Sequence, residues 1–250
     1  MNVDIFIRTY EKDLEWLKYA LKSIRLHVTG YRNIVITIPD ESLIAKSSDY
    51  VVIQVEDLKD GYLGQQFTKM NAHLYTDADA VLFWDSDMIA CEPVDISEWT
   101  LDGKPIILKT SYHSIQFTLN KTPLTEESMR TLLSNTLNWK KITEKALGFS
   151  VESEYMRRMP LLYFTDTIAA SSKWIENNHR VTLRKYLNSQ PYRTFSEFNA
   201  IGAYAEKFES DRYAFIDTDT DEIPKNKVHQ FWSWSGLDSN DLKQIKQYIG

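Results

Sequence analysis

Residues 80–95, AVLFWDSDMIACEPVD, set two carboxylates, Asp85 and Asp87, directly after five apolar residues. A buried carboxylate pair is costly in free energy unless its charge is neutralised. A divalent cation would neutralise it, and carboxylate oxygens suit Mg²⁺ or Mn²⁺, which keep coordination positions open for the phosphate oxygens of a substrate. The spacing D-x-D after a strand therefore predicts a metal site at Asp85 and Asp87.

The same spacing occurs twice more, and the surrounding residues distinguish the three cases. Residues 77–79 precede their strand and are typical of a solvated turn. Residues 217–221 begin like a calcium-binding loop, but the sixth position is Glu222 instead of Gly and the twelfth is Val228 instead of Glu. We interpret that segment as a polar turn.

The elements that would position Asp85 and Asp87 follow from short apolar runs that alternate with helical spacing. We expect strands at residues 3–10, 33–40, 50–57, 80–84 and 105–110, and helices at residues 14–28 and 63–75. Apolar strands separated by helices predict a mostly parallel sheet that is covered on both faces. Ligands of such sheets collect at the carboxyl ends of the strands, where Asp85 and Asp87 would lie.

Composition favours a single folded domain without a membrane span. The chain has 250 residues, of which 43% are hydrophobic and 26% charged, so it can bury a full core. It has no apolar run of ~18 residues, and residues 1–13 have the pattern of a first strand instead of a signal peptide. Its single cysteine, Cys91, cannot form an internal disulfide or a Cys-based zinc site. We therefore expect a soluble, cytoplasmic protein.

The order of these motifs resembles that of the GT-A glycosyltransferases. The β-α-β start, the helix with GQQFTKMNAHLYTDAD and the segment VLFWDSDMI carry the resemblance over about residues 3–108, and FSEFNAIGAYA and VHQFW extend it weakly. The resemblance implies a GT-A (Rossmann-like) α/β fold with a mostly parallel central sheet flanked by helices. It also implies that the D-x-D motif holds Mn²⁺ or Mg²⁺ and a nucleotide sugar, most plausibly a UDP-sugar.

By this resemblance, Asp85 would contact the donor ribose or the metal, with Ser86 beside it, and Asp87 would ligate the metal. The end of the first strand would hold the nucleotide base through Arg8, Thr9 and Tyr10. Tyr10 offers a ring for base stacking, although a surface aromatic at a loop start is the equal alternative.

Two residues of the second helix, Gln66 and Lys69, lie about one turn apart and could both face the donor. A solvated helix face is the alternative for Lys69. Many GT-A enzymes have a histidine near the C-terminus as a further metal ligand, and KNKVHQFWSWSG offers His229, with Lys227 available for the diphosphate. The alternative for His229 is a hydrogen-bonded core position beside Phe231.

A second candidate group comes from YRTFSEFNAIGAYAEKF. Ser196 is a good helix N-cap, which puts Glu197 in the first turn. Glu197 would face the acceptor hydroxyl as a general base or an orienting hydrogen-bond acceptor, while its plain alternative is a favourable interaction with the helix dipole. Asp166 is the second candidate for the same role, with helix capping as the alternative.

We expect one catalytic domain over residues 1–250. Residues 1–110 would bind the nucleotide sugar, 121–190 would form a mainly helical insertion on the acceptor side, and 191–250 would complete the site. Residues 121–193 carry 12 Lys/Arg against 7 Asp/Glu, although the whole chain has a net charge of −6. The basic residues of the insertion are Lys140, Lys141, Lys145, Arg157, Arg158, Arg180, Arg184 and Lys185. An anionic acceptor would match this charge, as would solvated helix faces.

The expected activity is metal-dependent transfer of a hexose or pentose from a nucleotide sugar to an acceptor hydroxyl. The acceptor could be a glycan, a lipid-linked sugar or a hydroxymethylated base in DNA. Two alternatives stay open: a Mg²⁺-dependent phosphohydrolase with Asp85 as nucleophile, and a non-catalytic module that binds nucleotide sugars. The transferred sugar, the stereochemistry and the oligomeric state also stay open.

Overall fold

A computed structural model describes residues 1–156, 160–233 and 236–250 of the chain. Its helices are α1 (Leu14–His27), α2 (Gly61–Met70), α3 (Tyr112–Lys121), α4 (Glu127–Leu147), α5 (Thr165–His179), α6 (Leu183–Asn188), α7 (Glu197–Phe208) and α8 (Ser239–Ile249). Its strands are β1 (Val3–Arg8), β2 (Val28–Thr29), β3 (Ile34–Ile38), β4 (Val51–Gln54), β5 (Ala80–Phe83), β6 (Met88–Ala90), β7 (Val94–Asp95), β8 (Thr100–Leu101), β9 (Lys104–Ser111), β10 (Ser153–Glu154), β11 (Leu161–Phe164), β12 (Ala214–Asp217) and β13 (Val228–Gln230).

Short 3₁₀ turns connect several of these elements: Glu11–Asp13, Glu41–Leu43, Ala72–Leu74 and Ile96–Trp99. Arg157 and Arg158, two of the basic residues expected on the acceptor side, lie outside the described residues.

The central sheet has the strand order β11-β5-β1-β3-β4. β5, β1, β3 and β4 run parallel, and β11 pairs antiparallel with β5. The strands form where apolar residues run without interruption, and β1, β3 and β5 are buried along their whole lengths. Such burial on both faces is typical of a parallel sheet between helices. The prediction of an α/β protein with a mostly parallel central sheet flanked by helices is confirmed.

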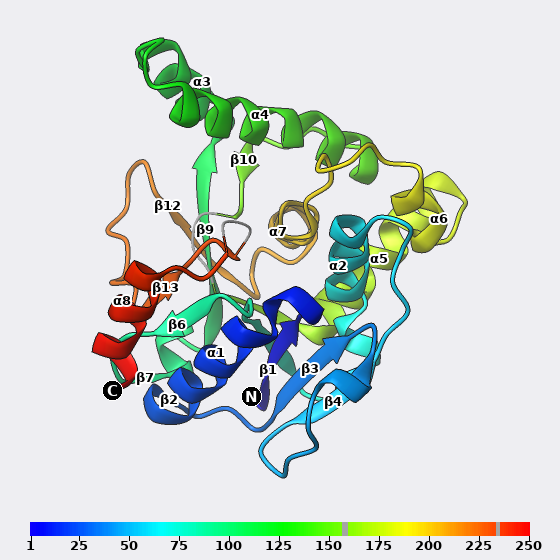
Figure 1. Cartoon of the computed structure of the whole chain (residues 1–250). Coiled ribbons are helices and arrows are strands. Elements are labelled where there is room, and N and C mark those ends of the chain that lie inside the picture. The colour runs from blue at the N-terminus through cyan, green and yellow to red at the C-terminus, as the bar shows by residue number, and fades with distance from the viewer. Residues whose placement is uncertain (157–159, 234–235) are drawn as a thin grey trace.

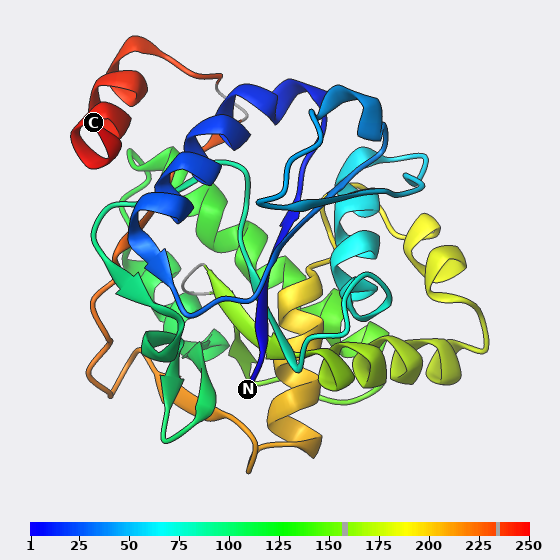
Figure 2. The ribbon, with the colours of Figure 1, turned by 90° about the horizontal axis from the view of Figure 1, so that it is seen from below.

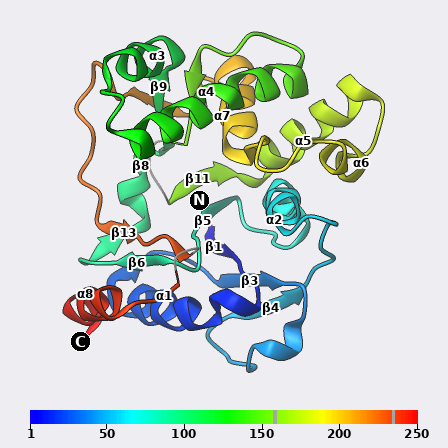
Figure 3. The same ribbon diagram turned by 45° about the horizontal axis from the view of Figure 1, so that its top comes forward.

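The connections reverse direction between β1 and β5. From β1 the chain proceeds outward through α1 to β3 and then to β4, and it returns through α2 to β5 on the other side of β1. Right-handed crossovers then put α1 and α2 on opposite faces of the sheet, as Figure 3 shows. The carboxyl ends of β1 and β5 therefore flank the point where open α/β sheets bind their ligands.

The two faces of the sheet have different covers. α1 lies on one face and α8 lies beside it, whereas α2, α5 and α7 lie on the other (Figures 2 and 3). One large apolar core surrounds the sheet. A second, smaller cluster joins α1, β6 and α8 through Trp16, Ala20, Ile89, Phe231, Ile245 and Ile249.

The middle of the chain is less purely helical than expected. β11 lies within residues 121–190 and completes the edge of the central sheet, so this segment is part of the core fold as well as an insertion. The strand expected at residues 105–110 exists as β9, but it belongs to a separate sheet with the order β10-β9-β12. α3 and α4 extend from the end of β9 at the top of Figure 1.

None of the helices in residues 1–156, 160–233 and 236–250 is long and apolar enough to cross a membrane.

Candidate functional site

Asp85, Ser86 and Asp87 form the turn between β5 and β6, at the carboxyl edge of the sheet. The backbone N–H of Trp84 donates to Phe6 O at 2.9 Å. The hydrogen bonding between β1 and β5 thus continues to Trp84, the residue directly before the turn. The N–H of Met88 then donates to Asp85 O at 3.0 Å and closes the turn. The carboxylates are thus held where the predicted parallel sheet would place a ligand.

Asp87 is buried and only half satisfied. Its Oδ2 accepts a hydrogen bond from the backbone N–H of Ser233 at 2.9 Å, while its Oδ1 has no partner among the described residues. The residue is 7% exposed. Burial, and after it the charge of Asp85, raises the pKa of Asp87 to about 7. Within residues 1–156, 160–233 and 236–250, no cationic side chain pairs with an anion in this position.

Asp85 is held by a buried ion-pair network. Lys69 Nζ donates to Asp85 Oδ1 at 2.7 Å and lies 3.3 Å from Glu197 Oε1, with the Lys69 and Glu197 side chains each 3% exposed. Gln66 Oε1 accepts from the backbone N–H of Glu197 at 2.9 Å and joins α2 to the start of α7. Lys69 is therefore not on a solvated helix face.

Glu197, at the start of α7, belongs to the same ion-pair network. The helix start at Ser196 is confirmed, because Ser196 Oγ accepts from the N–H of Asn199 at 3.4 Å. The Glu197 carboxylate, however, is buried against Lys69. Burial raises its pKa, and Lys69 counteracts that shift. A general-base role for Glu197 stays a prediction.

Asp13 is a member of the site that sequence reasoning did not single out. It directly precedes α1, where its side chain makes no capping hydrogen bond. Instead, its Oδ2 accepts from Ser86 Oγ at 3.3 Å. Burial raises the pKa of Asp13, and the charge of Asp85 adds to the shift. A carboxylate before a helix is ordinarily a cap, so only the folded chain identifies this one as part of the site.

The donor set suits a hard cation. Carboxylates of Asp13, Asp85 and Asp87 interact electrostatically, and the buried Oδ1 of Asp87 has no hydrogen-bond donor in the described chain. An oxygen-binding cation such as Mg²⁺ or Mn²⁺ would supply the missing positive charge. No group of three or more His, Cys, Asp or Glu side chains arranged to hold a metal is found among the residues that the structure describes.

Arg8 and Thr9, predicted to hold a nucleotide base, are buried at the end of β1. The Arg8 guanidinium donates to Thr9 O and lies 3.3 Å from Asp57 Oδ2. Gly64 makes room for this pair, because a Cβ there would lie 1.6 Å from Asp57 Oδ1. Arg8 thus stabilises the end of β1 against the start of α2.

Tyr10 lies at the surface of the site and is 44% exposed. Burial raises its pKa, and Asp13, Asp87 and Tyr192 contribute to the shift. Tyr192 lies edge-on to Tyr62, with 6.1 Å between ring centroids. Tyr62 and Tyr192 thus form an aromatic pair, and we call these two residues with Tyr10 the aromatic cluster because Tyr192 contributes to the pKa shift of Tyr10. Only Tyr10 was predicted from the sequence.

His229 and Lys227 have partners away from Asp85. His229 lies on β13 opposite Ile89, its Nδ1 is 3.4 Å from Gln244 Nε2, and its ring centroid is 4.4 Å from that of Phe231. Lys227 Nζ is 2.7 Å from Glu98 Oε2. These contacts resemble the core position considered for His229, and its role as a ligand stays a prediction, as does a role for Lys227 with the diphosphate.

Asp166 lies at the opposite edge of the sheet. β11 runs antiparallel to β5, so Phe164 pairs with Ala80 and the chain enters α5 at the amino end of β5. Asp166 accepts from Arg212 Nη2 at 2.9 and 3.0 Å. The prediction that Asp166 could take the same role as Glu197 is therefore not supported, because the two residues do not share a site.

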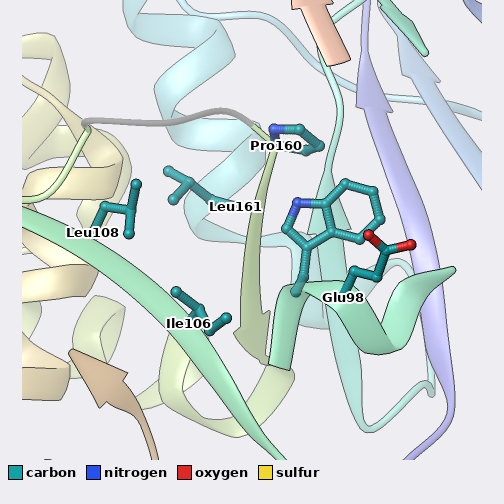
Figure 4. A pocket seen from close by; sticks show the side chains of 6 residues that line it. Glu98, Ile106, Leu108, Pro160 and Leu161 are labelled. Atoms are coloured by element: carbon teal, nitrogen blue, oxygen red, sulfur yellow. The ribbon is translucent and has the colours of Figure 1, made fainter. Parts of the chain in front are cut away.

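Figure 4 shows a small pocket of about 10 Å³ lined by Glu98, Trp99, Ile106, Leu108, Pro160 and Leu161. This volume is about that of one water molecule. None of its lining residues belongs to the carboxylate site.

Comparison of the chain with protein-family models gives no match, and comparison with curated proteins gives none either.

Proposed function

We propose that the protein is a metal-dependent glycosyltransferase of the GT-A type, which transfers a sugar from a UDP-sugar to an acceptor hydroxyl. The observation that supports this proposal most strongly is the buried, unpartnered Oδ1 of Asp87 beside Asp85 at the carboxyl edge of β5. These two carboxylates belong to the D-x-D motif and lie between the ends of β1 and β5, the place where α/β sheets bind nucleotides.

Asp87 and Asp85 would hold Mg²⁺ or Mn²⁺, and Asp13 lies close enough to add to the negative potential. When bound, the cation supplies positive charge that stabilises the departing diphosphate. Lys69 fixes the Asp85 side chain by its 2.7 Å hydrogen bond to Oδ1, which leaves Oδ2 for the ligand side. The Ser233 N–H similarly fixes Oδ2 of Asp87 and leaves Oδ1.

Glu197 would act indirectly. Its carboxylate lies 3.3 Å from Lys69 Nζ and its N–H is bound by Gln66, so it holds the lysine against Asp85. We propose that Glu197 is a positioning residue. Tyr10, exposed at the end of β1, would provide the ring on which the nucleotide base stacks.

The test is an assay without acceptor, in which UDP-sugars and simple phosphate monoesters are each incubated with Mn²⁺ or EDTA. Slow, metal-dependent release of UDP that is lost in Asp87→Ala would support the transferase. Phosphate release from monoesters would instead indicate a phosphohydrolase with Asp85 as nucleophile. Binding of UDP-sugar without turnover would indicate a binding module.

A further inference from the structure

A turn between α6 and α7 presents two residues beside the aromatic cluster. The turn comprises residues 191–194, and the connection passes above the start of α2 in Figure 1. Thr194 closes it, because its Oγ1 donates to Pro191 O at 2.7 Å. Tyr192 is 62% exposed at its tip. A large aromatic side chain in this position offers an open ring face at low conformational entropy cost.

Arg193 has an unfavourable backbone conformation at the same turn. Its φ is 55°, in the left-handed region that glycine and asparagine adopt most readily. Residues in this region persist where the surroundings enforce them, and they are common in ligand-binding segments. An arginine at a glycine-like position suggests that its side chain is needed there.

The Arg193 side chain has no acidic partner in the described part of the chain. Its Cζ lies 5.3 Å from the centre of the Tyr192 ring, and no Asp or Glu of the described residues forms an ion pair with it. Five other arginines are each paired with a carboxylate: Arg8, Arg25, Arg32, Arg184 and Arg212. Arg193 is thus a cation available to a ligand.

The turn borders the carboxylate site. The Tyr192 ring centroid is 6.1 Å from that of Tyr62, whose hydroxyl donates to Phe195 O at 3.0 Å. Burial raises the pKa of Tyr62, the charge of Glu197 adds to the shift, and Arg193 opposes it. Tyr192 is also among the groups that raise the pKa of Tyr10, after burial, Asp13 and Asp87. The ring of Tyr192 and the guanidinium of Arg193 therefore lie next to the site and not on a remote face.

We propose that Tyr192 and Arg193 form an acceptor subsite for an acidic sugar, an inference that rests on the proposed glycosyl transfer. The sugar ring would stack on Tyr192 through its C–H face, and its anionic substituent would accept two hydrogen bonds from the Arg193 guanidinium. A planar guanidinium binds carboxylate and phosphate groups in this bidentate manner. A uronate and a sugar phosphate share this chemistry.

The test compares Arg193→Gly with Arg180→Gly in the full chain. Arg180 is also an arginine at positive φ, 54°, but it ends α5, so both variants lose one charge and both relieve the backbone. Dissociation constants would be measured by NMR titration with methyl glucuronide, glucose 6-phosphate and methyl glucoside, in the presence of UDP and Mn²⁺. The two acidic probes distinguish a carboxylate from a phosphate ligand.

We expect the wild type to bind at least one acidic probe about tenfold more tightly than the neutral probe, as one charge-assisted hydrogen-bond pair can provide. Arg193→Gly should lose this preference, Arg180→Gly should keep it, and Tyr192→Ala should weaken binding of all three probes. Neither glycine variant should unfold at a lower temperature than the wild type. An unchanged preference in Arg193→Gly, or no preference in the wild type, would overturn the subsite.

Release of UDP from a UDP-sugar without acceptor separates this inference from the proposed function. If release depends on Asp87 but the acidic preference is absent, the transferase stands and the subsite fails. If the preference depends on Arg193 but no nucleotide sugar is ever turned over, the anion site stands and glycosyl transfer fails.

Discussion

Asp87→Asn should stabilise the metal-free protein, although it removes a residue that we place at the centre of the site. Burial and the charge of Asp85 raise the pKa of Asp87 from 3.8 to about 7, so the folded state favours the protonated carboxyl. Asp87 therefore does not reduce the free energy of unfolding below its unfolded pKa, where it is protonated in both states. It reduces this free energy progressively as pH rises from there toward 7. An asparagine keeps the acceptor for the Ser233 N–H and carries no charge.

The magnitude follows from the shift. A difference of about three pKa units at roughly 1.4 kcal/mol per unit gives about 4 kcal/mol at pH 8. At pH 5 the same relation gives about 2 kcal/mol. The free-energy cost of protonating the carboxyl on folding is smaller there, because pH 5 lies only about one unit above the unfolded pKa. The gain in free energy of unfolding for Asp87→Asn should therefore increase between about pH 4 and pH 7 and then level off.

Urea denaturation in EDTA, followed at several pH values, measures this gain directly. Asp211→Asn, a change at an exposed carboxylate in the turn after α7, is the matched control and should show no such rise. Added Mn²⁺ should reverse the order, since a cation that binds only the folded state at 100 times its dissociation constant adds about 2.7 kcal/mol to the wild type. A variant that is less stable than the wild type at pH 8 in EDTA would refute the reasoning.

Three further variants test the packing and the ion pairs of the site. Gly64→Ala should lower the free energy of unfolding by about 1–3 kcal/mol in urea denaturation, because its Cβ would collide with Asp57. Gly61→Ala is its control, as the nearest atom there is 4.0 Å away. Lys69→Met should lower the free energy of unfolding by about 3–5 kcal/mol in the same assay, because it leaves the buried Glu197 and the partly buried Asp85 without a cation. A loss no larger than that of the same substitution at an exposed lysine would contradict the network. Glu197→Gln should reduce turnover in steady-state kinetics by less than the roughly 10²–10⁴-fold expected for a general base, and a larger loss would restore that role.

The parts of the fold that the sequence predicted are those encoded by local patterns. β1, β3 and β5 are continuous apolar runs, and the D-x-D turn follows one of them, so the position of Asp85 and Asp87 at the carboxyl edge could be inferred. β11 was missed because its four residues lie within a segment of helical character.

Other parts of the site depend on contacts between distant segments. Lys69 looks like a residue on a solvated helix face, and only the packing of α2 against α7 buries it between two carboxylates. Asp13 and Tyr192 lie on turns far apart in the chain, and each reaches the site through tertiary structure. Asp166 was placed at the site because the antiparallel direction of β11 could not be inferred from the sequence.

The most direct test of the proposed function is a crystal structure of the protein soaked with UDP and Mn²⁺. We predict Mn²⁺ coordinated by Oδ1 of Asp87 and by diphosphate oxygens, with the uracil ring near Tyr10 at the end of β1. UDP bound elsewhere, or an Asp87 carboxylate that stays uncoordinated at saturating Mn²⁺, would contradict the account.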